Sequence, residues 1–167
     1  VQKMVDDDRD CQEILQQLRD RWPEDALPLY LIEADLLSDL DLFREAMAVY
    51  DQGLLAFPGD PDLLYSRGLH ALNLDRLDIL EQDLKAIIAE DPKNADALNA
   101  LGYSLADQTE RFAEALIYIE RALALKPEDP AVLDSMGWVQ YRIGSPNKAL
   151  EYLRKAHALM PDGEIAA

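Results

Sequence analysis

The chain has 167 residues, and its 16 basic and 33 acidic side chains give a formal charge of −17. This charge excludes a typical nucleic-acid binder, because phosphate binding needs clusters of Lys and Arg. No run approaches the roughly 20 apolar residues of a membrane helix, and the single cysteine excludes an internal disulfide.

Residues 1–26 are predicted to hold the second half of a helical hairpin. A polar lead-in, VQKMVDDDRD, precedes CQEILQQLRDRWP, which has the apolar spacing of a helix and ends at Pro23. Cys11 stands where a small buried side chain is expected. Trp22 is predicted to pack against the following hairpin, with an exposed recognition tryptophan as the alternative. Because the chain opens within the pattern, we expect it to be a fragment of a longer array.

Residues 27–60 are predicted to form the first complete hairpin. Apolar spacing places its helices over Leu27–Ser38 and Leu42–Ala56. Pro58 follows the second helix, and a proline cannot continue a helix.

Residues 61–94 are predicted to form a second hairpin with a different crossing. Leu80 and Ile87 stand where the neighbouring hairpins carry alanine or glycine. Larger side chains between two helices hold the backbones apart, so we expect this hairpin to be wider than the others.

Residues 95–129 show the hairpin pattern most clearly. Leu98, Leu101 and Leu105 follow the three-and-four spacing of one helix face, and the polar connector DQTER leads into a second apolar helix. Small side chains that allow close approach stand where the two helices would cross, at Gly102, Ala115 and Ala122.

Residues 130–163 are predicted to form a fourth hairpin. Pro146 stands near the start of its second helix, where a missing backbone N–H costs nothing. Residues 164–167 are predicted to begin a further, truncated helix.

The five closing prolines recur at almost constant intervals of 35, 34, 35 and 34 residues. They are Pro23, Pro58, Pro92, Pro127 and Pro161. A period near 34 with small residues at the crossings resembles the tetratricopeptide repeat (TPR) family. The resemblance covers almost the whole chain and implies an all-α fold, a right-handed superhelix of stacked helical hairpins.

Residue patterns for catalysis or metal binding are missing. His70 and His157 lie in different hairpins, and neither has metal-ligand residues at the usual spacings. No glycine-rich phosphate loop occurs. We therefore expect no enzyme activity, no metal and no cofactor.

Surface residues are the remaining candidates for function. The resemblance implies that first helices line a concave groove, which predicts a partner-binding row at Leu31, Asp35, Tyr65, Leu69, Asn99, Tyr103, Asp134, Trp138 and Arg142. Aromatic and arginine side chains are common binding hot spots, and Trp138 is the predicted anchor. The alternative is that the two tyrosines and Trp138 only pack between successive first helices.

The acidic excess lies in the first three-quarters of the chain, whereas residues 130–163 carry a net charge of +1. An acidic, partly apolar groove suits a hydrophobic or basic protein segment. The alternative interpretation of the charge is a solvated surface that keeps the protein soluble.

A closer resemblance concerns residues 95–167, in the runs LNALGYSLADQTERFAEAL, VLDSMGWVQYRIG and LRKAHALMPDGEIAA. These runs look like the C-terminal part of Gram-negative TPR lipoproteins of the outer membrane. That resemblance implies a periplasmic adaptor that tethers a carboxyl-terminal processing protease and helps to deliver cell-wall hydrolases to it. The lipid anchor would belong to the parent protein, and this segment itself would not contact the membrane. A cytoplasmic location is the alternative.

Two classes of function follow from the sequence. The first is a scaffold or adaptor that binds a protein or peptide in the concave groove. The second is a structural segment that self-associates by stacking its open ends, through the helix with Cys11 and Leu18 or the helix with Tyr152 and Leu159.

Overall fold

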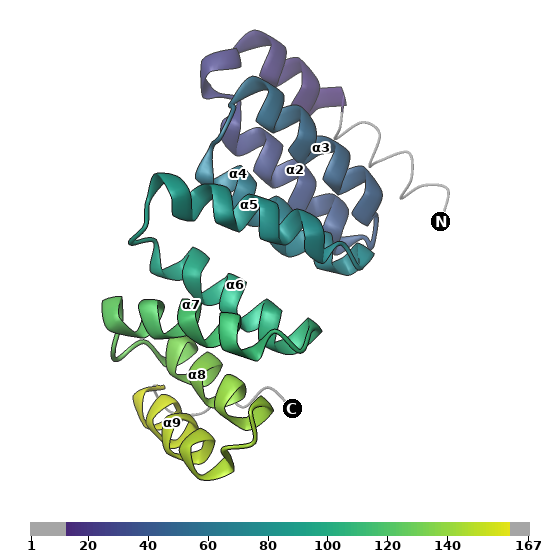
Figure 1. The fold of residues 1–167 in the computed structure, drawn as a ribbon. Coiled ribbons are helices and arrows are strands. Elements are labelled where there is room, and N and C mark those ends of the chain that lie inside the picture. The colour runs from purple at the N-terminus through teal and green to yellow at the C-terminus, as the bar shows by residue number, and fades with distance from the viewer. Residues whose placement is uncertain (1–12, 161–167) are drawn as a thin grey trace. The chain divides into compact units, whose positions relative to one another are not determined.

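The computed structural model describes residues 13–160, and in these residues every regular element is a helix (Figure 1). The predicted all-α fold is therefore confirmed. Cys11 and residues 164–167 lie outside the described residues. Residues 13–21 are helical, and the elements that follow are η1 (Pro23–Asp25), α2 (Leu27–Asp39), α3 (Phe43–Ala56), α4 (Pro61–Ala71), η2 (Leu72–Leu74), α5 (Leu77–Glu90), α6 (Ala95–Gln108), α7 (Phe112–Leu125), α8 (Pro130–Arg142) and α9 (Pro146–Leu159).

Side-chain caps fix where several first helices begin. The carboxylates of Asp60 and Asp129 each accept hydrogen bonds from two backbone N–H groups of the following helix, and Asn94 accepts one from Ala97. Pro61 and Pro130 occupy the first helical positions, where no N–H donor is needed. These short polar signals set the repeat boundaries.

The chain divides into two compact units, and the division falls inside α5, between Asp83 and Leu84. In unit 1, α3 packs against both α2 and α4. In unit 2, α6 pairs with α7 and α8 with α9, while α8 also contacts α6 and α7 (Figure 1). Successive first helices are therefore neighbours within unit 2, as hairpin stacking requires.

Each unit has its own apolar core. In unit 1, the fully buried Tyr50 and Leu63 pack with Ala34, Ala46 and further buried side chains. In unit 2, the predicted helix faces are buried, including Leu98, Leu101, Leu105, Ala115, Ile119, Ala122, Val132 and Val139.

Trp22 is partly exposed. Its side chain is 47% exposed, and the Arg21 guanidinium lies 4.8 Å from the ring centroid. The tryptophan is therefore about half covered, and its packing against the following hairpin stays a prediction.

The helix crossings differ between hairpins as the side chains predict. A Cβ atom on Gly102 would lie 2.6 Å from Ile119 Cγ1 and 2.9 Å from the Ala115 carbonyl oxygen, whereas on Gly68 its nearest neighbours would be 3.5 Å away. Leu80 is one of those neighbours of Gly68. The α4–α5 crossing therefore has room that the α6–α7 crossing lacks.

The variant Gly102→Ala is expected to lower the free energy of unfolding by about 1–2 kcal/mol, because the backbone of α7 must shift to admit a methyl group. Gly68→Ala is the matched control and should raise stability by up to about 1 kcal/mol, since alanine is the better helix former. Urea denaturation of both variants measures the difference. Equal effects would contradict the unequal crossings.

Candidate functional site

In unit 1, the predicted site residues lie on α2 and α4. Asp35 is exposed, its carboxylate accepts a hydrogen bond from the Tyr50 hydroxyl (2.9 Å), and it lies 3.6 Å from His70 Nε2. Burial, followed by the hydrogen bond to Asp35, raises the pKa of Tyr50 well above its usual value. Leu69 is exposed at the surface, while Tyr65 is half-buried. The carboxylate thus links the two first helices while remaining open to solvent.

Leu31 lies differently from its neighbours in the predicted row. Its side chain is partly buried and packs against the unit 1 core. On the same helix, Ile32 and Leu36 are exposed, and the sequence analysis did not select them. They are four residues apart and so share one face of α2. The sequence did indicate this second apolar face, because α2 has apolar side chains outside the face that is buried.

In unit 2, α6 and α8 bring three of the predicted residues together. Burial, followed by the charges of Asp107 and Asp134, raises the pKa of Tyr103. Tyr103 and Asp134 therefore lie near each other on adjacent first helices, and both are exposed. Asn99 on α6 is half-buried, and its Oδ1 has no hydrogen-bond partner. An unpaired buried acceptor is costly, and the N–H of a bound segment could satisfy it.

Trp138 is held within an aromatic cluster. Its ring stacks on that of Tyr141, with centroids 5.8 Å apart, and the Arg142 guanidinium lies 5.7 Å from its centroid. The indole Nε1 is buried without a hydrogen-bond partner. The Tyr141 side chain is exposed beside it.

Arg142 is already engaged within unit 2. Its guanidinium donates hydrogen bonds to the carbonyl oxygens of Asp107 (2.9 Å) and Thr109 (3.4 Å), and it lies 5.0 Å from the Phe112 ring centroid. These contacts tie the end of α8 to the end of α6. Arg142 therefore positions the tryptophan cluster in addition to any contact with a partner.

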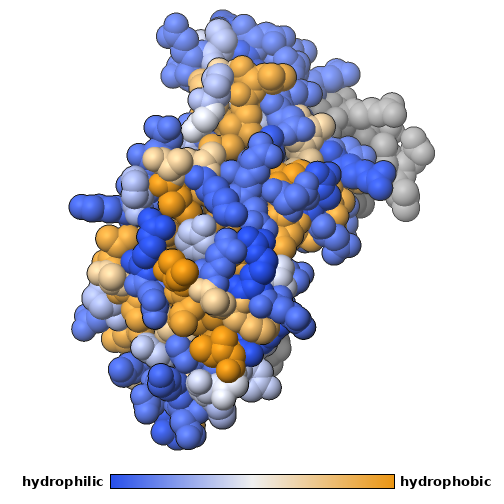
Figure 2. Space-filling model, in the orientation of Figure 1, coloured by the Kyte–Doolittle hydropathy of each residue, from blue (hydrophilic) through white to orange (hydrophobic). Residues whose placement is uncertain are grey.

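An apolar hollow of about 410 Å³ opens beside this cluster, between α8 and α9. It is lined by Trp138, Tyr141, Pro146, Leu150 and Leu153, with Gly137 and Ala149 at its base. On the face shown in Figure 2, apolar side chains gather in patches separated by hydrophilic ones. Volumes of this size can hold one or two large apolar side chains of another protein.

Among residues 13–160, no group of three or more His, Cys, Asp or Glu side chains could hold a metal ion. In the same residues, no helix is long and apolar enough to cross a membrane.

Residues 81–130 match the family model of the tetratricopeptide repeat. A TPR repeat-containing protein of Pseudomonas aeruginosa, PA4667, is 47% identical over 153 residues, which are 92% of this chain. The chain spans only 26% of the length of that relative.

Solved structures share the fold at low identity. YrrB, described as a TPR protein with an unusual peptide-binding site, superposes with a TM-score of 0.71 at 20% identity, over 98% of this chain and 85% of YrrB. A structure of MamA gives a TM-score of 0.72 at 18% identity, over 94% of this chain and 85% of MamA. MamA from Desulfovibrio magneticus RS-1 gives 0.68 at 23% identity, over 91% of this chain and 94% of the matched MamA chain. All three belong to the helical-hairpin fold described above.

Proposed function

We propose that this chain is a protein-interaction scaffold whose first helices bind a segment of a partner protein. The observation that carries the proposal is the cluster of Trp138 and Tyr141 beside an apolar hollow, with Tyr103 exposed on the adjacent first helix. Large aromatic side chains at a surface are the residues on which protein interfaces concentrate their binding energy. TPR repeats bind proteins or peptides, and the structurally similar YrrB is described as having a peptide-binding site.

The charge of the surface indicates the chemistry of the partner. The Asp35 side chain is exposed on α2. Asp134 is exposed on α8, and its charge contributes to the raised pKa of Tyr103 on α6. In unit 2, a segment with a basic residue next to an aliphatic or aromatic one would complement Asp134 and the neighbouring aromatic cluster. We expect its association to weaken as salt rises, because exposed charges are screened.

A peptide selection tests this proposal. The full chain is immobilised and used to select short random peptides displayed on phage, and isothermal titration calorimetry then measures the affinity of the selected peptides. We expect basic, partly apolar peptides whose affinity falls about tenfold between low salt and several times physiological salt. Failure to enrich any peptide, or enrichment of acidic peptides, would contradict the proposal.

We further propose that the parent protein is a periplasmic adaptor, anchored at the outer membrane, that tethers a carboxyl-terminal processing protease to its cell-wall hydrolase substrates. The support is the resemblance of residues 95–167 to TPR lipoproteins with that role. Calorimetry of the full-length parent with the purified protease tests the tether, and absence of binding would remove this assignment while leaving the scaffold proposal intact. Fractionation of cells tests the location, with cytoplasmic recovery as the contrary outcome.

Self-association is the second candidate function, and the exposed apolar side chains of α9 favour it. Leu150, Leu153 and Leu159 are exposed along this helix, and Met160 is exposed directly after it. If copies associate through α9, sedimentation velocity of the full-length parent should show an oligomer that Leu150→Glu converts to monomer. A parent that is monomeric at high concentration would exclude this function.

A further inference from the structure

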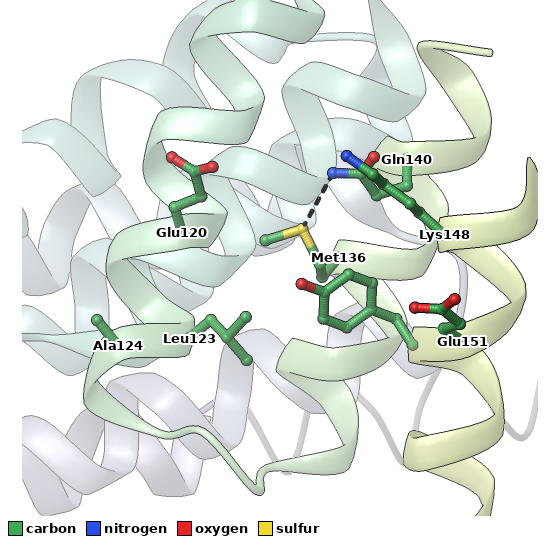
Figure 3. A pocket seen from close by; sticks show the side chains of 8 residues that line it. Glu120, Leu123, Ala124, Met136, Gln140, Lys148 and Glu151 are labelled. Atoms are coloured by element: carbon green, nitrogen blue, oxygen red, sulfur yellow. Dashed lines mark hydrogen bonds between the residues drawn. The ribbon is translucent and has the colours of Figure 1, made fainter. Parts of the chain in front are cut away.

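A second pocket lies on a different part of unit 2, between the second helices α7 and α9 (Figure 3). Its volume is about 500 Å³, which is in the range of ligand-binding pockets. Met136 and Gln140 of α8 form its floor, Glu120 and Leu123 of α7 form one wall, and Lys148 and Tyr152 of α9 form the other. None of the predicted site residues lines it.

Gln140 is an unusual side chain for its position. The aligned residues of the other hairpins are Leu37, Ala71 and Leu105, which are all buried and apolar. Gln140 is only 8% exposed, so a polar amide occupies a core position. A buried amide without good partners lowers stability, so its presence requires a reason.

The hydrogen bonding of Gln140 is weak. Its Nε2 donates to the Met136 thioether sulfur at 3.7 Å, and a thioether is a poor acceptor (Figure 3). No described residue donates a hydrogen bond to its Oε1. Two buried carboxylates are strongly paired, Glu33 with Arg19 and Asp83 with Arg67. Gln140 therefore differs in having both a donor and an acceptor available for a stronger partner.

We propose that this pocket binds an extended peptide segment through the carboxamide of Gln140. A carboxamide has the same donor and acceptor as a backbone peptide group and can therefore form a pair of hydrogen bonds with one. In the bound state, the Nε2 donor would exchange the thioether for a peptide carbonyl, and Oε1 would accept a peptide N–H. The first exchange replaces a weak thioether acceptor by a good one, and the second replaces solvent at Oε1, which is not among the buried atoms that lack a partner.

The rest of the pocket defines the side chains of that segment. Leu123, Ala124 and Met136 offer an apolar surface next to the amide. Glu120 and Glu151 lie on either side of the pocket, and Lys148 extends toward Gln140 (Figure 3). With two carboxylates and one ammonium, the rim favours a peptide with an apolar residue followed or preceded by a basic one. The proposal does not depend on binding at the first helices.

The variant Gln140→Met tests the proposal because methionine keeps the length of the side chain and removes the amide. Peptides selected on the wild-type chain are assayed by calorimetry on both proteins. We expect a class of peptides that loses at least tenfold in affinity on Gln140→Met and retains it on Gln82→Met, the same change at an exposed site on α5. In two-dimensional amide NMR, these peptides should shift the signals of Lys148 and Tyr152 and leave the Trp138 indole N–H unchanged.

Stability provides the second measurement. Because the amide is poorly partnered, Gln140→Leu, which restores the residue found at two aligned positions, should raise Tm by about 2–4 °C. A lowered Tm for both variants would show that the amide serves the fold and would overturn the proposal. So would a selection in which every peptide binds Gln140→Met as tightly as wild type, or shifts only the Trp138 signal.

Discussion

The variant Arg67→Met is expected to lower the free energy of unfolding by about 3–5 kcal/mol, because it leaves a buried carboxylate without its cation. Asp83 is only 1% exposed, and Arg67 donates two hydrogen bonds to it, from Nη2 at 2.6 Å and Nε at 2.8 Å. Arg67 also donates to Asp51 at 2.7 Å. One guanidinium therefore joins α4 to both α3 and α5 within unit 1.

The electrostatics of this cluster agree with that expectation. The hydrogen bonds that Arg67 donates to Asp83 are the main cause that raises the pKa of Arg67, and burial acts in the opposite direction. The arginine therefore remains charged. Without it, Asp83 would be a buried carboxylate whose desolvation cost is not offset by a cation. Urea denaturation followed by circular dichroism measures the loss.

Arg76→Met is the matched control. Arg76 makes a similar bidentate pair with Asp78, but both side chains are exposed. Solvent screens such pairs, so this variant should unfold at the same urea concentration as wild type. If the two variants lose equal stability, burial of Asp83 is not what gives the Arg67 cluster its strength.

The helical hairpins could be predicted because their signals are local. Period, small crossing residues and closing prolines are all read within about 34 residues, and the cap at Asp129 lies next to the helix that it begins. The wider crossing at Leu80 was also predictable, since side-chain volume limits how closely two backbones approach.

The roles of individual polar and surface residues depend on partners that are distant in sequence. Arg142 reaches carbonyl oxygens 33 and 35 residues away, and no local pattern encodes that pair. Arg67 stands at the repeat position occupied by Leu101 and Met136, so the sequence showed a polar residue in a core position but not its carboxylate partners. The helical period also failed to separate Leu31 from Ile32, because α2 is apolar on adjoining faces.

The variant Trp138→Ala is expected to weaken binding of first-helix partners by roughly 30-fold, or about 2 kcal/mol. The indole is one of the side chains that line the α8–α9 hollow, and stacking on Tyr141 with the Arg142 guanidinium nearby holds it in place before a partner arrives. A side chain that is already ordered loses little entropy on binding. Peptides selected on the wild-type chain that do not depend on Gln140 are the probes, and calorimetry measures their affinity.

The control is Trp22→Ala, because Trp22 is exposed and lies outside the predicted row. This change should leave the affinity of the same peptides within twofold of wild type, while Trp138→Ala reduces it at temperatures well below unfolding. Trp138 also packs on its neighbours, so its removal should lower stability by about 1–2 kcal/mol. The two effects are separable because affinity is measured on folded protein. If the melting temperature falls while the affinity of every probe stays constant, Trp138 serves packing alone and the anchor of the partner-binding surface lies elsewhere.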